Sequence, residues 1–226
     1  MDAGVKKLFV MRHAESLEDI DKSAYERIAD ADMPLSEYGR EQAKTFSLGF
    51  VHELVADKHL RLILSPSKRV LETAEIIVSG LPADILCSVS TEHLIVKQNW
   101  GNVTRDNRAE IEKQRYLAGV LRYQFPGGES GPEMLSRFDL FAEKLTREIA
   151  DKPTKSILII THGFGLRVLL KTILGWAEGY FESLALPPHC DLKRLIYDKG
   201  AFLLLDEMTV YDPSKNPGYI RRQSNE

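Results

Sequence analysis

Short apolar runs that alternate with amphipathic helical segments constrain the fold of this chain more than any other feature. Residues Ile157 to Ile160 are all apolar, as expected of a strand buried on both faces of a parallel sheet. Helical spacing is clearest from Leu135 to Ile149. This alternation predicts an α/β fold, a three-layer α/β/α sandwich around a mostly parallel sheet. The predicted strands are 8–11, 62–64, 85–89 and 157–160. The predicted helices are 36–57, one through Val70 to Ile77, 108–123, 132–149 and 163–174. Ser36 is the predicted N-cap of the first of these helices.

Cationic and hydroxyl side chains follow three of the predicted strands where each strand ends. The three ends are Arg12-His13-Ala14-Glu15-Ser16, Ser65-Pro66-Ser67-Lys68-Arg69 and Thr161-His162-Gly163. The carboxyl ends of parallel strands meet at one edge of a sheet, so two histidines and two arginines converge there beside helix N-termini. Guanidinium groups and helix dipoles both favour a dianion. The sequence therefore predicts a phosphate pocket at this edge.

The whole chain is expected to form a single domain over residues 1–226. With 226 residues, 43% of them hydrophobic, it can bury a full core without a metal or a disulfide. The predicted core covers residues 7 to about 206 and ends with a hairpin of 192–197 and 201–206. Insertions or loops over the pocket are predicted at 80–131 and 175–190, and a long loop or broken helix at 15–33. The last residues, 212–226, are predicted to form a loose tail.

Charge and composition argue against several other classes of protein. The chain has 30 basic and 33 acidic residues and a net charge of -3, so we expect no nucleic-acid partner. No apolar run approaches the roughly 20 residues of a membrane span, and the N-terminal MDAGVKK precedes too short an apolar run for a signal peptide. Cys87 and Cys190 have no metal or redox spacing. We therefore expect a cytoplasmic protein with reduced thiols, no membrane partner and no metal.

The strand-end motifs, together with the segments between them, resemble a known family. The matching segments are RHAES at 12–16, PLSEYGREQA at 34–43, SPSKR at 65–69 with ETA at 72–74, WGN at 100–102, PGGES at 126–130 and THG at 161–163. In this order and spacing they resemble the histidine phosphatase superfamily, the phosphoglycerate mutase-like phosphatases, over residues 7 to about 205. The resemblance implies a phosphoglycerate mutase-like fold and a metal-independent phosphatase without a cofactor.

The resemblance also implies a role for each strand-end residue. His13 would attack phosphorus and form a phosphohistidine, since an imidazole is nucleophilic when one ring nitrogen is unprotonated and the other donates to a backbone carbonyl. Arg12, Arg69 and His162 would hold the non-bridging oxygens and neutralise the transferring group. The expected substrate is a small phosphorylated molecule or a phosphopeptide. The remaining predicted substrate-binding residues are Ser16, Asp19, Lys97 and Gly163.

Two positions near the predicted pocket depart from the family pattern. Ala14 stands where the first motif usually has glycine, and we expect its methyl group to have a small effect. Asp19 stands where the family often has an asparagine that donates to the phosphate. A carboxylate there would repel a dianion unless it is protonated or turned away. The alternative is that the acidic loop 15–21 points to solvent.

Lys97 is the most consequential departure. Relatives carry a glutamate there, three residues before the aromatic residue of the Trp100-Gly101 pair, and it protonates the leaving group. A lysine acts as an acid near neutral pH only where burial depresses its pKa, and a clamp on phosphate or substrate is the simpler interpretation. Loss of a general acid costs about 10²–10⁴ in rate. Glu15, Glu92 and Lys97 itself are the candidates to replace it.

Two other functions are open from the sequence. Asp19 and Lys97 could have removed turnover and left a regulatory module that binds a phosphate ligand. A phosphoglycerate mutase-type phosphotransferase is the poorer hypothesis, because the usual acid is absent and no extra basic cluster for a bisphosphate is evident. The intact set of Arg12, His13, Arg69 and His162 favours a phosphatase.

Overall fold

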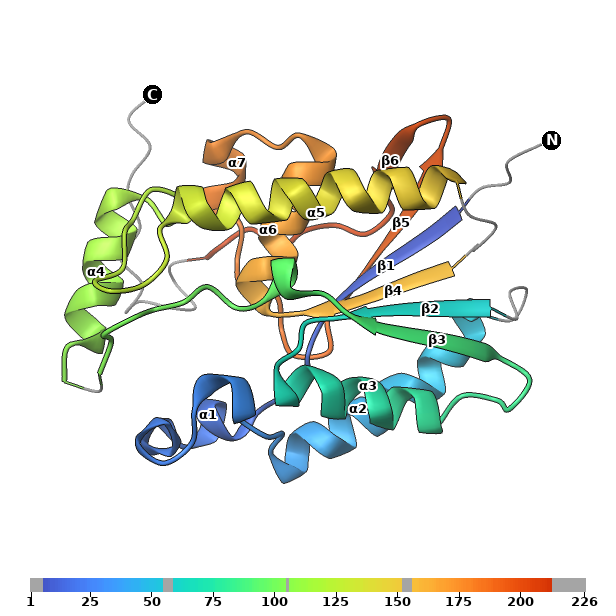
Figure 1. Cartoon of the computed structure of the whole chain (residues 1–226), viewed down its shortest axis with the longest axis horizontal. Coiled ribbons are helices and arrows are strands. Elements are labelled where there is room, and N and C mark those ends of the chain that lie inside the picture. The colour runs from blue at the N-terminus through green and yellow to red at the C-terminus, as the bar shows by residue number, and fades with distance from the viewer. Residues whose placement is uncertain (1–5, 55–58, 105, 152–155, 213–226) are drawn as a thin grey trace.

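A twisted six-stranded sheet forms the centre of the molecule, in the order β3-β2-β4-β1-β5-β6 (Figure 1). The computed structural model describes residues 6–54, 59–104, 106–151 and 156–212, and the predicted loose tail lies outside them beyond Asp212. Strands β3, β2, β4 and β1 run parallel, while β5 joins β1 and β6 joins β5 in antiparallel pairs. The strands are β1 (Lys6–Arg12), β2 (His59–Leu64), β3 (Leu86–Thr91), β4 (Ser156–Thr161), β5 (Leu192–Asp198) and β6 (Ala201–Leu204).

Helices cover both faces of the sheet (Figure 1). α2 (Glu37–Phe50) and α3 (Lys68–Ser79) pack together on one side, and α5 (Gly131–Asp151) and α6 (Gly163–Leu174) on the other. The predicted three-layer α/β/α sandwich with a mostly parallel sheet is therefore confirmed. Within the described ranges, no helix is both long and apolar enough to cross a membrane. The shorter elements are α1 (Leu17–Ile20), α4 (Arg108–Ala118), α7 (Glu178–Ser183) and the 3-10 helices η1 (Lys22–Glu26), η2 (Asp30–Asp32), η3 (Val51–Leu54) and η4 (His93–Ile95).

Strand β4 shows why a continuous apolar run predicts a central strand. All of its residues are buried, and successive side chains point to opposite faces of the sheet. Ile159 belongs to the same apolar cluster as Phe138 of α5, whereas Leu158 and Ile160 belong to a second cluster with Phe50 of α2. The strand thus packs against both helical layers, and its carboxyl end opens directly into the His162–Gly163 turn.

Several element boundaries differ from the predicted ones. Ser36 is the N-cap of α2, as predicted, and its Oγ accepts from the Gly39 N–H at 2.9 Å. α2 ends at Phe50 and continues only as the 3-10 turn η3, while the last predicted residues, 55–57, lie outside the described ranges. The predicted helix 108–123 is too long, because the chain leaves the helix at Gly119 with a φ of 93° that favours glycine.

Candidate active site

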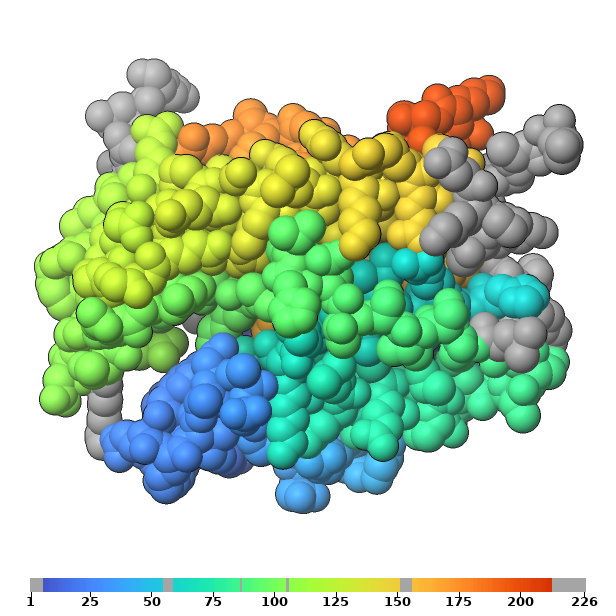
Figure 2. Space-filling model, in the orientation of Figure 1, coloured from blue at the N-terminus to red at the C-terminus, as the bar shows by residue number. Residues whose placement is uncertain are grey.

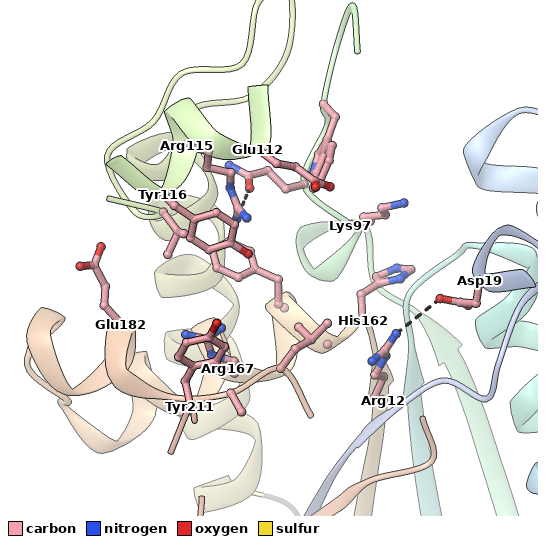
Figure 3. Close-up of a pocket in the computed structure, with 18 of the residues that line it drawn as sticks. Arg12, Asp19, Lys97, Glu112, Arg115, Tyr116, His162, Arg167, Glu182 and Tyr211 are labelled. Carbon is pink, nitrogen blue, oxygen red and sulfur yellow. Dashed lines mark hydrogen bonds and ion pairs between the residues drawn. The ribbon is translucent and has the colours of Figure 1, made fainter. Parts of the chain in front are cut away.

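A cavity of about 580 Å³ opens at the carboxyl ends of β1 and β4. Figure 2 shows the molecule hollowed between the blue segment around α1 and the green α4. Its two sides are distinct in Figure 3. We call one side the reaction end (Arg12, His13, Asp19, Lys97, His162 and Gly163) and the other the far wall (Arg108, Glu112, Arg115, Tyr116, Arg167, Glu182 and Tyr211).

His13 follows the last residue of β1 and is only 3% exposed. Its Nδ1 lies 2.7 Å from the Ala14 carbonyl oxygen. A carbonyl only accepts, so Nδ1 carries the hydrogen and Nε2 keeps its lone pair. Burial, and then the charges of Arg69 and Arg12, lower the pKa of His13 well below its usual value. His13 is therefore a neutral imidazole with a free nucleophilic nitrogen.

His162 lies beside His13, at the start of α6. The two rings are 5.2 Å apart between centroids and meet edge to face. Its Nε2 is 3.0 Å from Ser65 Oγ, at the end of β2. Burial and the charge of Arg69 lower the pKa of His162. The three strand ends therefore meet as predicted, and Gly163, the first residue of α6, also lines the cavity.

Arg69 is fully buried and faces Asp30 instead of the cavity. It donates to the backbone oxygen of Asp30 at 2.7 Å and to the Asp30 carboxylate at 3.2 Å, and its Nη2 is 3.5 Å from Nδ1 of His162. Burial alone would raise the pKa of Asp30, but Lys97 and Arg69 hold it below its usual value. The Arg69 guanidinium thus binds Asp30, whereas the resemblance implies that it binds a phosphoryl oxygen of the substrate.

Lys97 lines the cavity, and its ammonium group is surrounded by hydrogen-bond acceptors. Its ammonium donates to Glu18 at 3.1 Å, to Asp30 at 2.7 Å and to the Tyr25 hydroxyl at 2.7 Å. An ammonium group has three N–H donors. The three partners use all three N–H donors of Lys97. They also neutralise its positive charge, which the sequence predicts to bind phosphate or substrate.

Asp19 lines the cavity instead of pointing to solvent. Its Oδ2 accepts from the N–H and the Oγ of Ser16, at 2.9 and 2.6 Å. Its Oδ1 is 3.8 Å from Arg12 Nη2, and Oδ2 is 3.2 Å from His189 Nε2 (Figure 3 shows the Arg12 pair). Burial alone would raise the pKa of Asp19, but hydrogen bonds with His189 and Ser16 hold it well below its usual value. The carboxylate is paired instead of solvated, and Ser16 lies buried behind it, outside the cavity lining.

The carboxylates predicted to replace the missing acid lie elsewhere. Glu15 accepts from Ser36 Oγ at 2.7 Å, and Glu92 pairs with Lys144 at 2.5 Å. Neither lines the cavity, because both are used to fix neighbouring loops. In the described part of the chain, no group of three or more His, Cys, Asp or Glu side chains is arranged to hold a metal ion.

The far wall contains a basic cluster that is not evident from the sequence. Arg108 and Arg115 are two turns apart on one face of α4, and Arg167 joins them from α6. Arg108 donates to Glu112 at 3.0 Å. The seven-residue spacing on one helix is the signal that could have found the first two. The guanidinium carbons of Arg108, Arg115 and Arg167 lie 4.9, 4.4 and 4.4 Å from the ring centroids of Trp100, Phe164 and Phe181.

Comparison with known proteins decides the family. The model of the histidine phosphatase superfamily (branch 1) matches residues 8–207. This chain belongs to the histidine phosphatase superfamily. The chain is similar to the phosphoglycerate mutase-like protein AT74H of Arabidopsis thaliana, which is 28% identical over 83% of this chain and 73% of its own length. The broad-range acid phosphatase DET1 of Saccharomyces cerevisiae is 31% identical over 50% of this chain and 35% of its own length.

Several solved structures share the fold of this chain. A phosphoglycerate mutase from Bacillus anthracis superposes with a TM-score of 0.70 at 18% identity, over 91% of this chain and 94% of its own. A mycobacterial glucosyl-3-phosphoglycerate phosphatase superposes with a TM-score of 0.69 at 18% identity, over 91% of this chain and 100% of its own. At this level of identity the likeness establishes the architecture only.

Proposed function

We propose that this protein is a phosphatase that hydrolyses phosphate monoesters through a phosphohistidine on His13. The observation that carries this proposal is the state of His13, whose Nδ1 hydrogen is held by the Ala14 carbonyl and whose Nε2 is free in the cavity. Arg12 and His162 line the same cavity, and Arg69 lies directly behind His162. These groups supply positive charge and hydrogen-bond donors where a transferring phosphoryl group develops negative charge.

The proposed reaction has two steps. Nε2 of His13 attacks phosphorus, and the ester bond breaks with its electron pair on the leaving oxygen, which takes up a proton as the alcohol departs. Water then attacks phosphorus, the P–N bond breaks with its electron pair on Nε2, and phosphate leaves. Arg69 exchanges its Asp30 contact for a phosphoryl oxygen. The low pKa of His13 keeps the nucleophile neutral in mildly acidic solution.

The size and lining of the cavity support a metabolite as substrate. Its volume of about 580 Å³ falls in the range typical of small-molecule sites. Trp100 and Tyr116 contribute aromatic side chains to the lining, and the arginines of the far wall offer contacts to polar groups. We therefore propose a phosphorylated small molecule as substrate, with the phosphate at the reaction end and the remainder against the far wall.

Trapping of the intermediate tests this proposal. A ³²P-labelled aryl phosphate ester is mixed with the wild-type protein and with His13→Ala, and His52→Ala, an exposed histidine of η3, serves as the matched control. We expect base-stable, acid-labile label on the wild type and on His52→Ala, and none on His13→Ala. Absence of label on the wild type, with equal turnover by His13→Ala, would overturn the proposal.

A phosphoglycerate mutase-type transfer is a second candidate, because the far wall holds the extra basic cluster that such a reaction needs. In that reaction a second anionic group would bind to Arg108, Arg115 and Arg167, which line the far wall. A mutase returns the phosphoryl group to the bound alcohol, whereas a phosphatase gives it to water. Release of free phosphate from a labelled monophosphoglycerate, without formation of the isomer, would support the phosphatase and exclude the mutase.

A further inference from the structure

The structure leaves the protonation of the leaving group without an obvious donor. Lys97 replaces the expected glutamate and uses its three N–H groups on Glu18, Tyr25 and Asp30. The Lys97 ammonium donates to both oxygens of Glu18, at 3.1 and 3.4 Å, so neither oxygen is placed as a donor. A proton donor must therefore come from another element next to the reaction end.

His189 is a further titratable side chain, and it contacts Arg12, His13 and Asp19 of the reaction end from just outside the cavity lining. Its ring centroid is 5.8 Å from that of His13, and its Nε2 is 2.6 Å from Arg12 Nη2. The same Nε2 is 3.2 Å from Asp19 Oδ2. A phosphoryl oxygen held by Arg12 Nη2 at about 2.8 Å would therefore lie next to His189.

The loop that carries His189 is fixed to the strand that carries the nucleophile. Arg12 donates to Pro187 O at 2.7 Å through its side chain and to Asp191 O at 3.1 Å through its backbone N–H. Cys190 has a φ of 58°, a left-handed conformation that is costly for a residue other than glycine. Such a conformation is kept only where the surroundings impose it, so this loop holds the His189 ring in one place.

We propose that His189 is the proton donor of this enzyme and that Asp19 is its positioning residue. As His13 Nε2 forms its bond to phosphorus, the ester bond breaks, and the proton on His189 Nε2 passes to the leaving oxygen. The neutral His189 then takes a proton from the attacking water in the second step. Asp19 stabilises the protonated imidazole, as a carboxylate does beside a catalytic histidine. This inference rests on the proposed phosphatase activity.

Two sets of partners correspond to the two protonation states of His189. In the ligand-free structure Arg12 Nη2 can donate to a bare Nε2, whereas a protonated Nε2 pairs with Asp19. Substrate that draws Arg12 onto a phosphoryl oxygen would leave Asp19 as the partner. Among the residues that the structure describes, the charged and titratable groups in contact with the ring are Arg12 and His13 from the end of β1 and Asp19 from α1.

Dependence on the leaving group tests the proposal. Turnover of p-nitrophenyl phosphate, a good leaving group, is compared with that of glycerol phosphate, a poor one, in the wild type, His189→Asn and the control His52→Asn. We expect His189→Asn to lose about 10²–10³ on glycerol phosphate and less than about tenfold on p-nitrophenyl phosphate, with labelled His13 still formed from the aryl ester. Equal losses on the two esters would overturn the assignment.

Further variants separate His189 from its neighbours. Asp19→Asn should show a smaller loss of the same kind and should move the alkaline limb of the pH–rate profile to lower pH, which a merely structural role would not do. Lys97→Met and Glu18→Gln should change both esters by the same factor. A loss confined to glycerol phosphate in Glu18→Gln, but not in His189→Asn, would place the donor on α1 instead. If the wild type forms no phosphohistidine, the proposed function fails first, and this inference fails with it.

Discussion

The two sides of the cavity are built from different parts of the chain and by different means. Four of the six reaction-end residues lie at or directly after the carboxyl ends of β1 and β4, and the register of the sheet fixes their positions; they are Arg12, His13, His162 and Gly163. The far wall consists mainly of side chains from α4, α6 and α7, which reach the cavity from outside the sheet. The difference indicates a reaction end of fixed geometry beside a far wall whose contacts depend on which substrate is bound. Changes at the reaction end should therefore affect all substrates, and changes at the far wall only some of them.

The largest loss of activity should follow substitution of His162. This prediction tests whether the reaction end acts on every substrate. His162→Ala removes a donor to the transferring phosphoryl group, and we expect kcat to fall about 10²–10³-fold on small and large phosphate esters alike. Steady-state kinetics on p-nitrophenyl phosphate and on a sugar phosphate measure it. A loss on only one of the two esters would contradict the division between the two sides.

An effect of intermediate size is expected on the pH dependence of the free energy of unfolding. This dependence arises at the reaction end, because His13 and His162 are buried there. The pKa values of His13 and His162 are lowered in the folded protein, so below about pH 6.5 the unfolded chain binds more protons than the folded one. The free energy of unfolding should therefore fall as pH falls from about 6.5, by about 1.4 kcal/mol per pH unit for each proton.

Urea denaturation between pH 7.5 and 5 measures this dependence. The double variant His13→Asn/His162→Asn should lose most of the slope, and the far-wall variant Arg115→Met should keep it. A wild-type free energy of unfolding that stays constant from pH 7.5 to 5.5 would show that the two histidines are not held neutral.

The smallest effect should come from Arg115 on a small substrate. Arg115→Met should change kcat/KM for p-nitrophenyl phosphate by less than about threefold, or about 0.6 kcal/mol, because that ester does not extend to the far wall. For a phosphate that carries a second anionic group we expect KM to rise about tenfold. Thermal unfolding of the variant provides the check on folding, and equal effects on both esters would remove the distinction between the two sides.

Most of the fold and the strand-end part of the site follow from local sequence. The apolar runs before Arg12, Arg69 and His162 predict buried strands, and parallel pairing brings their ends to one edge. The tautomer-fixing contact of His13 needs only the next residue, Ala14. These features depend on short segments and on general rules for parallel sheets.

The remaining features depend on pairings between distant segments, which periodicity does not encode. Asp30 meets Arg69 across 39 positions, and Lys97 meets Glu18 across 79. His189 reaches Asp19 only because its loop is fixed to the end of β1. A single sequence shows that these residues are charged, but it does not show which of them neutralise one another.

The position of β4 in the sheet has a consequence for how the protein acquires its activity. β4 lies between β2 and β1, so the first two strands of the chain are connected in the sheet only through Ser156–Thr161. His13 and Arg69 are made early but have no fixed relation to each other before that strand is inserted between them. Such long-range pairing is slow to form, so during synthesis phosphate binding should appear only after β4 has joined β2 to β1.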